Sequence, residues 1–493
     1  MTAGRPALDV AVVGAGPAGL ATAYALAEAG CTVRVLEAAD AVGGRMRTVR
    51  EHGCLIDTGA EMFPGRAGYP ATWRLITALG LDRDPEAVPN VRRALAVWRD
   101  GRPRPNVGRP LGLLTGAGLG PRARLDLVRL QARLARLGDL DPARPEASSL
   151  GAATVADLVR PYHRDVSEHL VGPLVSGFFG WDPERSAAAP LAAHLVTCGG
   201  SASWHTYRDG MDTLARALAG RLDVTTGHPV TRVTEQGGTV RLASPRGTVA
   251  ARAAVLAVPA PVAARLHADE RPAVRTFLDT CGYTPMLRVS LVLDVPLAPG
   301  GSRSGFATLI PDADDRLLGV ITADHRKHPG RAPAGGGLVS LIASPLGCAD
   351  LFERPDRTVA ERLIARAERF VPGLSAHVAH VRVHRFEHGL PEATPRALRL
   401  RGVFARRPVS AVEYAGDWVM LRPCSEGAVA SAALAAERVL ACLAARSGPP
   451  WTASGGRPAR PAALSATADA RTTALSATAD APTAADSRPD DQR

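Results

Sequence analysis

The apolar residues near the N-terminus fall into two spacings that predict a strand, a helix and a second strand. Residues 10–13 form an uninterrupted apolar run, which is typical of a parallel strand buried on both faces. Residues 20–29 are rich in Ala, Leu and Glu and are followed by Gly30, a pattern that predicts a helix with glycine at its end. Residues 31–36 repeat the strand pattern. This order indicates an α/β fold with a parallel sheet.

Related patterns return in the middle and near the end of the chain. A helix is predicted at 210–222, and strands at 229–233 and 254–259. Residues 412–417 predict a strand that ends in an acid, and residues 425–444 predict an alanine-rich helix with Ser425 as its N-cap. The three blocks are separated by long stretches of different pattern, so we expect one domain to be assembled from distant segments.

The stretch between the second and third blocks predicts a sheet. Residues 287–293, 318–321 and 338–342 are short runs of apolar and alternating residues, which favour strands covered on at least one face. We expect this sheet to form the floor of a cavity.

A basic amphipathic helix is predicted at 121–137. Leu127, Val128, Leu130 and Leu134 lie on one side of it, and its arginines lie largely on the other. Two interpretations are open. The helix can dock on a membrane surface, or it can pack on the domain as a lid with a solvated arginine face.

The first predicted strand ends in a glycine motif with a dinucleotide spacing. Gly14, Gly16 and Gly19 form G-x-G-x-x-G, with Ala15 and Ala18 between them. The first glycine permits the tight turn, the second lets the backbone approach a pyrophosphate, and the third lets helix and strand pack closely. The N–H groups at the start of the helix then face the diphosphate.

An acid follows the second predicted strand. Glu37, next to Ala38, lies eighteen residues past Gly19, where a carboxylate can accept hydrogen bonds from both ribose hydroxyls. The same charge would repel a 2′-phosphate, which disfavours a ligand of the NADP type.

A second element follows that acid and identifies the kind of dinucleotide. Gly43-Gly44-Arg45 and then Asp57-Thr58-Gly59-Ala60 resemble the FAD-dependent amine oxidase superfamily, which includes protoporphyrinogen oxidases, phytoene desaturases and monoamine oxidases. The resemblance implies that the second element lies beside a flavin, with Arg45 directed at a diphosphate or a flavin carbonyl.

The resemblance extends to the other two blocks. It implies that the backbone of Val230 contacts adenine, that Asp417 hydrogen-bonds the ribityl chain or the diphosphate, and that the helix after Ser425 directs its positive end at the flavin. The residues that we predict to bind noncovalent FAD are Gly14, Ala15, Gly16, Ala18, Gly19, Glu37, Ala38, Gly44, Arg45, Gly59, Ala60, Glu61, Met62, Val230, Gly416, Asp417, Gly427, Ala428 and Val429.

These blocks predict the domain organisation. We expect an α/β chain with a two-layer Rossmann-like FAD-binding domain of the p-hydroxybenzoate-hydroxylase and glutathione-reductase type, together with a discontinuous α+β substrate domain. The predicted segments are 1–62, 207–265 and 380–446 for the FAD-binding domain, 63–206 for a helical lid, 266–379 for the substrate sheet, and 447–493 for a disordered tail.

Composition and charge exclude several other classes. The net charge of +11 is spread along the 493 residues without a nucleic-acid-binding motif, so nucleic acid is not an expected partner. Seven scattered cysteines without C-x-x-C predict neither a disulfide framework nor a metal site. No signal peptide and no apolar run of membrane-spanning length are seen, so we expect a cytoplasmic protein, with peripheral membrane contact through 121–137 left open.

The chemistry follows from the single dinucleotide fingerprint. Without a second one for a nicotinamide, electrons should leave the substrate as a hydride to flavin N5 and pass on to oxygen or another acceptor. Segments 164–186 and 384–391 are similar to the protoporphyrinogen oxidase and desaturase branch. We therefore predict a dehydrogenase or desaturase of an apolar or conjugated small molecule.

Two alternatives remain open at this stage. An amine or amino-acid oxidase is disfavoured because Arg288 stands where many amine oxidases have lysine, and because an aromatic cage is hard to supply from 4% aromatic residues. Lys327 is expected in a Gly/Pro-rich loop. A non-redox flavoprotein, an isomerase or mutase, would share the same fingerprints.

No catalytic residue and no oligomeric state is assigned from the sequence. His384, His388 and Tyr207 are candidates by composition or position only. Cys424 precedes the C-terminal helix, and we expect a buried small residue there rather than a covalent flavin link.

Overall fold

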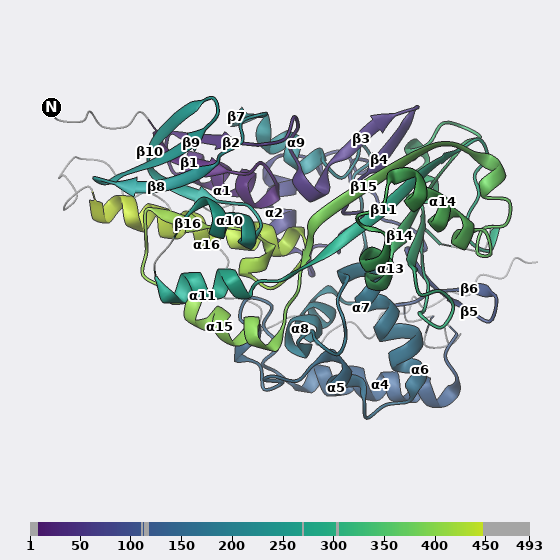
Figure 1. The fold of residues 1–493 in the computed structure, drawn as a ribbon. Helices are drawn as coiled ribbons and strands as arrows, with labels where there is room; N and C mark the ends of the chain where they lie inside the picture. The colour runs from purple at the N-terminus through teal and green to yellow at the C-terminus, as the bar shows by residue number, and fades with distance from the viewer. Residues whose placement is uncertain (1–7, 110–111, 113–117, 269–270, 302–304, 447–493) are drawn as a thin grey trace, which may run out of the picture.

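The computed structural model describes residues 8–109, 112, 118–268, 271–301 and 305–446. Residues 1–7 of the predicted FAD-binding domain and the predicted disordered tail at 447–493 lie outside the described residues. Within them, two seven-stranded sheets and a group of helices make up the molecule (Figure 1).

The first sheet contains the predicted N-terminal, middle and C-terminal blocks. Its order is β7-β2-β1-β10-β9-β8, and β16 pairs with β10 on the other side of that path. Strands β7, β2, β1, β10 and β16 are parallel, whereas β9 and β8 are antiparallel. The bounds are β1 Leu8–Val13, β2 Val33–Leu36, β7 Asp223–Thr225, β8 Arg232–Gln236, β9 Thr239–Ser244, β10 Gly247–Leu256 and β16 Val412–Tyr414.

Alternate residues of β1 face two different cores, which explains its continuous apolar run. Val10 and Val12 pack with α1 (Pro17–Glu28) and α16 (Ser425–Arg446). Ala11 and Val13 belong to the opposite core, which includes residues of the helices α10 (Ala260–Leu266), α11 (Pro272–Thr280) and α15 (Pro395–Ala405). Both faces of the strand are therefore covered, as expected for a parallel strand.

Helices α1 and α16, on the first face of the sheet, bring the N-terminal and C-terminal parts of the described chain together. Helices α1 and α16 pack against each other, so the purple N-terminal and yellow C-terminal ends of the described chain lie side by side (Figure 1). The buried face of α16 is rich in alanine, including Ala428, Ala432 and Ala435. Small side chains of this kind allow the two helices to approach closely.

The second sheet has the order β15-β11-β14-β13-β12-β5-β6. The three predicted strands of the second insert are present as β11, β13 and β14. The bounds are β5 Leu95–Arg99, β6 Arg102–Pro105, β11 Tyr283–Leu293, β12 Ala307–Leu309, β13 Leu318–Ala323, β14 Gly337–Ala343 and β15 Val378–Pro391.

This sheet draws strands from outside the insert that we expected to form it. Strands β5 and β6 come from 63–206, which is thus not wholly helical, and β5 pairs with β12. The long strand β15 pairs with β11 although most of it falls within the predicted FAD-binding segment 380–446. Both differences arise because strands from distant segments pair with each other, and the local sequence pattern does not reveal such pairing.

Helices α13 (Pro345–Leu351) and α14 (Asp356–Ala367) cover one face of this sheet, and α7 (Gly172–Phe179) contacts β12 and β13 at the cavity. Strands β3 (Thr48–Glu51) and β4 (Cys54–Asp57) pair with each other in a separate two-stranded sheet. The remaining helices are α2 Pro70–Ala78, α4 Pro121–Arg136, α5 Val155–Val159, α6 Arg164–Val166, α8 Ala188–Cys198, α9 Thr213–Ala219 and α12 Asp324–Lys327.

Helix α4 packs differently from the predicted apolar side. Leu130 and Leu134 are buried with Ala123, whereas Val128 is 47% exposed and Leu125 is 52% exposed. Val128 was therefore wrongly assigned to the packed side. The buried stripe favours the lid interpretation for that face, and the membrane interpretation stays a prediction.

Three element boundaries differ from the sequence prediction. Helix α1 begins at Pro17 rather than Leu20, because proline suits the first helical position and Gly16 serves as N-cap. Helix α9 is shorter than 210–222, since Gly210 has a positive φ. Ser425 is the first residue of α16 rather than the cap before it.

Helix α16 is also the helix, among the described residues, that is long and apolar enough to cross a membrane by length and composition. The sequence prediction of no such stretch counted only uninterrupted apolar runs. Half of the most apolar window of α16 is buried inside the fold, and the helix packs on α1 in the core.

Candidate functional site

A cavity of about 960 Å³ lies between the two sheets and is lined by residues of both, together with helices of the 63–206 insert. This volume lies at the upper end of the range for small-molecule sites. All of the predicted cofactor-binding residues line it except Ala15, Gly19, Gly427 and Val429. The fold thus brings together residues that are more than 400 positions apart, such as Gly14 and Asp417.

The glycines at the start of α1 have separate physical roles. A Cβ on Gly14, which has φ +102°, would lie 2.6 Å from the carbonyl oxygen of Ala257, and one on Gly19 would lie 1.9 Å from the carbonyl oxygen of Gly14. A Cβ on Gly16 would meet no protein atom within 4 Å, although Gly16 lines the cavity. Gly14 and Gly19 are needed by the fold, and Gly16 leaves room for a ligand.

Glu37 anchors the glycine loop from the end of β2. One carboxylate oxygen accepts a hydrogen bond from the Ala15 N–H at 2.6 Å, and the other accepts from the Ala39 N–H at 2.9 Å. Glu37 also lines the cavity. Its carboxylate is thereby held beside the start of α1, where the sequence predicted a ribose.

Arg45 and Asp417 join the N-terminal and C-terminal parts of the site. The two Nη atoms of Arg45 donate to the two carboxylate oxygens of Asp417, each at 2.9 Å, and Nη1 also donates to the Gly389 carbonyl at 2.8 Å. We expected Arg45 to point at a ligand and Asp417 to bind one. The structure pairs them with each other at the cavity wall, so their first role is to fix three chain segments together.

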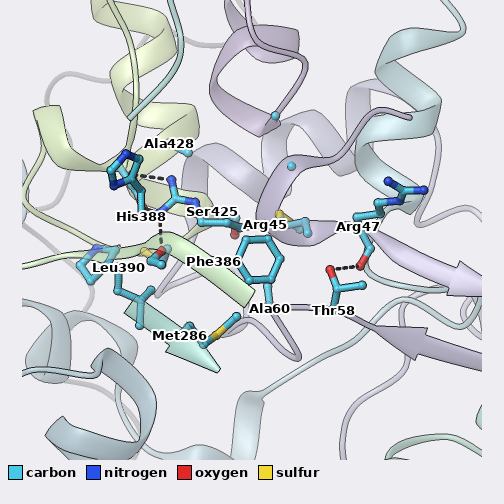
Figure 2. A pocket seen from close by; sticks show the side chains of 18 of the residues that line it. Arg45, Arg47, Thr58, Ala60, Met286, Phe386, His388, Leu390, Ser425 and Ala428 are labelled. Carbon is cyan, nitrogen blue, oxygen red and sulfur yellow. Dashed lines mark hydrogen bonds and ion pairs between the residues drawn. The ribbon is translucent and has the colours of Figure 1, made fainter. Parts of the chain in front are cut away.

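The start of α16 faces the same cavity. Cys424, Ser425 and Ala428 line it, and Figure 2 shows Ser425 and Ala428 near Arg45. A Cβ on Gly427 would lie 2.1 Å from the Arg422 carbonyl oxygen, so that glycine serves the turn before the helix. The positive end of a 22-residue helix is directed at the cavity.

These features fit a dinucleotide of the flavin type. The open position at Gly16, the acid at the end of β2 and two helix N-termini suit a ribose and a diphosphate. Val230 lines the cavity from the loop before β8, rather than from a strand as predicted. A loop leaves its backbone N–H and C=O free of a sheet ladder, which is what contact with a base edge requires.

The opposite part of the cavity is mainly apolar. Figure 2 shows Met286 and Phe386, which are paired on β11 and β15, beside Ala60. Aromatic side chains gather here despite their low overall frequency, which weakens the sequence argument against an aromatic cage. The aromatic residues that line the cavity are Phe63, Tyr69, Phe178, Phe179, Trp204, Phe306, Phe386 and Trp418.

Glu61 directly follows the signature that ends at Ala60, and it is held by two cations. Its carboxylate accepts from Nη1 of Arg288 and from Nζ of Lys327. Arg288 is fully buried on β11, and the Glu61 side chain is 10% exposed. Glu61 lines the cavity, whereas Arg288 and Lys327 do not.

Two further carboxylates complete this buried ion cluster. Asp57 accepts from Lys327 Nζ at 2.7 Å and lies 2.9 Å from Nη1 of Arg331. Asp324 lies 3.4 Å from both Arg288 and Lys327. Three acids and three bases therefore face one another, so the cluster carries no net charge when all are ionised.

The pKa values of Asp57 and Glu61 are shifted in opposite directions. Burial disfavours the charge of Asp57, but Lys327 and Arg331 outweigh it and hold the Asp57 pKa well below its usual range. Burial raises the pKa of Glu61 to about 7, because the cations Arg288 and Lys327 are offset by the nearby charges of Asp324 and Asp57. Glu61 is thus the member of the cluster that exchanges a proton near neutral pH.

The three residues named as candidates by composition or position occupy different environments. His384 lines the cavity opposite Arg288 on β15, its Nε2 has no hydrogen-bond partner among the described residues, and burial lowers its pKa to about 3. His388 lines the cavity, and its ring is tilted against that of Tyr283, with 5.3 Å between the ring centroids. Tyr207 is buried against Phe63 and does not line the cavity.

Cys424 lines the cavity beside a group of buried polar side chains. Burial raises the pKa of its thiol, and Tyr69 hydrogen-bonds it. The guanidinium group of Arg422 lies over the ring of Tyr69, 5.4 Å from the ring centroid. Cys424 is partly exposed at the cavity rather than fully buried as predicted, and a thiol with a raised pKa is a poor nucleophile.

Lys327 was misplaced by the sequence prediction. It ends the short helix α12 and is buried, rather than lying in a Gly/Pro-rich loop. One signal was present in the sequence: Lys327 is the sole lysine among 59 basic residues.

Comparisons with known proteins agree with this geometry. Residues 17–440 match the family of flavin-containing amine oxidoreductases. Over 182 residues the chain is 30% identical to protoporphyrinogen oxidase 2 of Arabidopsis thaliana, covering 36% of this chain and 33% of that protein. Over 264 residues it is 28% identical to hydroxyneurosporene desaturase of Cereibacter sphaeroides, covering 46% of this chain and 51% of that protein.

The aligned parts span a third to a half of the length of these curated relatives. The solved structure of cyclohexylamine oxidase from Brevibacterium oxydans has a TM-score of 0.71 and 20% identity, covering 89% of this chain and 100% of that chain. At that identity the likeness concerns the fold. The predicted α/β fold and flavin cofactor are confirmed, and the chain belongs to the family of flavin-containing amine oxidoreductases.

Proposed function

We propose that this protein is an FAD-dependent dehydrogenase or desaturase that removes a hydride from a C–H bond of a neutral, apolar or conjugated small molecule. The observation that carries the proposal is the pairing of charges at the cavity. Its two buried acids on the flavin side, Glu61 and Asp417, already bind Arg288, Lys327 and Arg45.

This pairing disfavours a cationic substrate. A buried ammonium group needs an unpaired anion close by, because desolvation of an uncompensated charge is costly. Glu37 also lines the cavity, but it holds the glycine loop. Glu387 lines the cavity from an exposed position on β15. The apolar wall then favours a substrate without charge at the reacting carbon.

The chain contributes binding, orientation and exclusion of water. When bound, the flavin supplies the acceptor for the hydride. Gly16, Glu37 and the start of α16 would hold the dinucleotide, and the loop Gly59–Ala60 would lie along the flavin ring. Met286, Phe386 and the aromatic residues of the insert would press the substrate toward that loop and keep water away.

The similarity to proteins named protoporphyrinogen oxidase and desaturase supports oxidation of C–C or C–N bonds in conjugated systems. The aromatic lining favours a second candidate, an amine oxidase in which rings surround a neutral amine. An isomerase that uses flavin without net reduction is the remaining alternative. The electron acceptor, peripheral membrane contact through α4 and cytoplasmic location stay predictions.

The proposed function is tested by anaerobic reduction of the purified holoenzyme. Porphyrinogens, partly saturated polyenes and primary and secondary amines are added in turn, and the flavin absorption band is followed. We expect bleaching with a neutral conjugated compound. Bleaching by amines alone would establish the amine oxidase instead, and conversion of a compound without bleaching would establish the isomerase.

A further inference from the structure

Glu61 has a position that none of the other buried acids of its cluster shares. It follows Gly59 and Ala60, which line the cavity in the flavin signature, and it lines the cavity itself. Asp57 and Asp324 are almost fully buried and do not line it. Among the three acids, Glu61 is therefore the one whose side chain keeps some exposure, 10% against 0% for Asp57 and 1% for Asp324, and the one that a bound molecule can approach.

The partners of Glu61 hold its carboxyl group in place through a change of charge. Arg288 on β11 and Lys327 on α12 both donate to it. Arg288 also donates to Ser340 Oγ at 2.7 Å, and Lys327 also donates to Asp57 at 2.7 Å. Each cation keeps a second partner if Glu61 is protonated, so the cluster tolerates that proton without leaving a cation unpaired.

The proposed reaction needs such a group. Removing two hydrogens from a saturated C–C bond breaks two C–H bonds and forms one C=C bond. One hydrogen leaves with both electrons as a hydride to the flavin, and the other leaves as a proton. Removal from an N–H and its neighbouring C–H balances in the same way. In both cases the proton requires an acceptor in the cavity.

We propose that Glu61 is the catalytic proton acceptor, taking the substrate proton on its carboxylate while the hydride leaves for the flavin. The inference rests on the proposed function, because an isomerase would return the proton to the product. Arg288 and Lys327 are positioning residues that hold the carboxylate at the cavity wall.

Three other titratable groups that line the cavity, His384, His194 and Asp417, suit this role less well. Burial lowers the pKa of His384 and of His194 to about 3, so neither imidazole binds a proton strongly at neutral pH. Asp417 is committed to Arg45 by two hydrogen bonds. A general base works best when its pKa lies near the operating pH, and burial brings the Glu61 pKa to about 7.

The groups that face Glu61 set the sign of the pH dependence. They are Arg288 from β11, Asp324 and Lys327 from α12, and Asp57 from β4, with Arg331 and His384 in the next layer. None of these acids has its pKa raised. A base must be ionised to act, so the rate should rise with pH through about 7 and then level off.

The first experiment uses the holoenzyme without substrate. The flavin absorption spectrum is recorded from pH 5 to 9, a range of about two units on each side of neutrality. A carboxyl that changes charge at the cavity should shift the band with a midpoint near 7. We expect Glu61→Gln to remove this transition and Glu392→Gln to retain it, since Glu392 is a buried acid paired with Arg185 outside the cavity.

The second experiment measures the rate of anaerobic flavin reduction with the substrate found above. Glu61→Gln should lower the rate by about 10²- to 10⁴-fold and abolish its rise with pH. Glu61→Asp keeps a carboxyl and should retain the pH dependence at a reduced rate. Flavin content and thermal midpoint of each variant show that it is folded.

The outcomes separate the two proposals. If no neutral compound reduces the wild-type flavin, the proposed function fails. If reduction is fast in wild type and Glu61→Gln shows the same rate and the same pH profile, the role of Glu61 is excluded while the proposed function stands. A spectral transition that persists in Glu61→Gln would likewise overturn the assignment.

Discussion

At the scale of single residues, the pair of Arg45 and Asp417 shows how the cavity is held together. The two residues come from opposite ends of the chain and form two hydrogen bonds of 2.9 Å each. The Asp417 side chain is 5% exposed and that of Arg45 is 31% exposed. A bidentate pair with one buried partner fixes both segments in direction as well as in distance.

Replacing Asp417 by asparagine should weaken flavin binding. The substitution removes the negative charge that orients Arg45. It also removes one of the two carboxylate oxygens that accept a hydrogen bond from Arg45. Hydrogen bonds to charged groups contribute roughly 1.5–3 kcal/mol, so we expect the affinity for FAD to fall about 10- to 100-fold. Titration of the apoprotein with FAD, followed by fluorescence, measures this change.

Asp223→Asn is the matched control, because it breaks an aspartate–arginine pair on neighbouring strands of the first sheet. Asp223 and Arg34 have side chains that are 51% and 41% exposed, and exposed pairs contribute little. We expect its FAD affinity to equal that of wild type. Equal affinities for both variants and wild type would show that the Arg45 pair is not needed for the cofactor.

At the scale of elements, the turn into α1 separates residues required by the fold from one required by the ligand. Gly19 has no room for a Cβ because the Gly14 carbonyl oxygen lies there. Gly16 caps the helix with φ −76°, a conformation open to any residue. Its Cβ would meet no protein atom within 4 Å.

Substitutions at these two glycines should therefore affect different properties: the stability of the apoprotein at Gly19 and the affinity for FAD at Gly16. Gly19→Ala should lower the free energy of unfolding of the apoprotein by about 1–3 kcal/mol, as overpacked sites do. Gly16→Ser keeps a favoured N-cap residue and should leave that stability within about 0.5 kcal/mol of wild type, while its affinity for FAD falls. Thermal denaturation of apoprotein and FAD titration distinguish them, and a stability loss from Gly16→Ser would contradict the assignment.

The short helix α12 is one element that the sequence reasoning misjudged. Lys327 was expected in a loop because glycine and proline follow it, yet Asp324–Lys327 forms a helical turn. The turn is stabilised by long-range contacts with Asp57 and Glu61. A four-residue helix has almost no local stability, so pattern and propensity carry little information about it.

At the scale of the whole molecule, the buried ion cluster links stability to pH. Asp57 has a lowered pKa, so its contribution to stability is present at neutral pH and is lost only in strongly acidic solution. Glu61 behaves in the opposite way. Its pKa rises from 4.5 to about 7 on folding, so folding favours the protonated form and the contribution is lost as pH increases across that interval.

The difference between wild type and Glu61→Gln should follow that sign. Between pH 4.5 and 7 the unfolded wild-type chain binds fewer protons at this residue than the folded chain does. The stability of wild type should therefore fall relative to the variant by about 3 kcal/mol over the interval. Chemical denaturation of both proteins at several pH values measures it, and a constant difference would refute the raised pKa.

The sequence by itself determined the cofactor domain. Its glycines, its acid at the end of β2 and its apolar strand runs act through contacts within about 40 residues, or through backbone conformations that few residue types adopt. Each of these features can therefore be recognised from a short stretch of sequence. They predicted the fold and the flavin, and they named residues that the structure gathers around one cavity.

Only the tertiary structure decided which side chains pair inside that cavity. Asp57, Glu61, Arg288, Lys327 and Arg331 lie on three separate stretches of the chain, and their charges were visible in the sequence without their partners. Whether a buried carboxyl is ionised depends on the few ångströms around it, because Coulomb energies and desolvation change steeply over that distance. That surrounding space is created by the packing of the two sheets, and no local pattern encodes it.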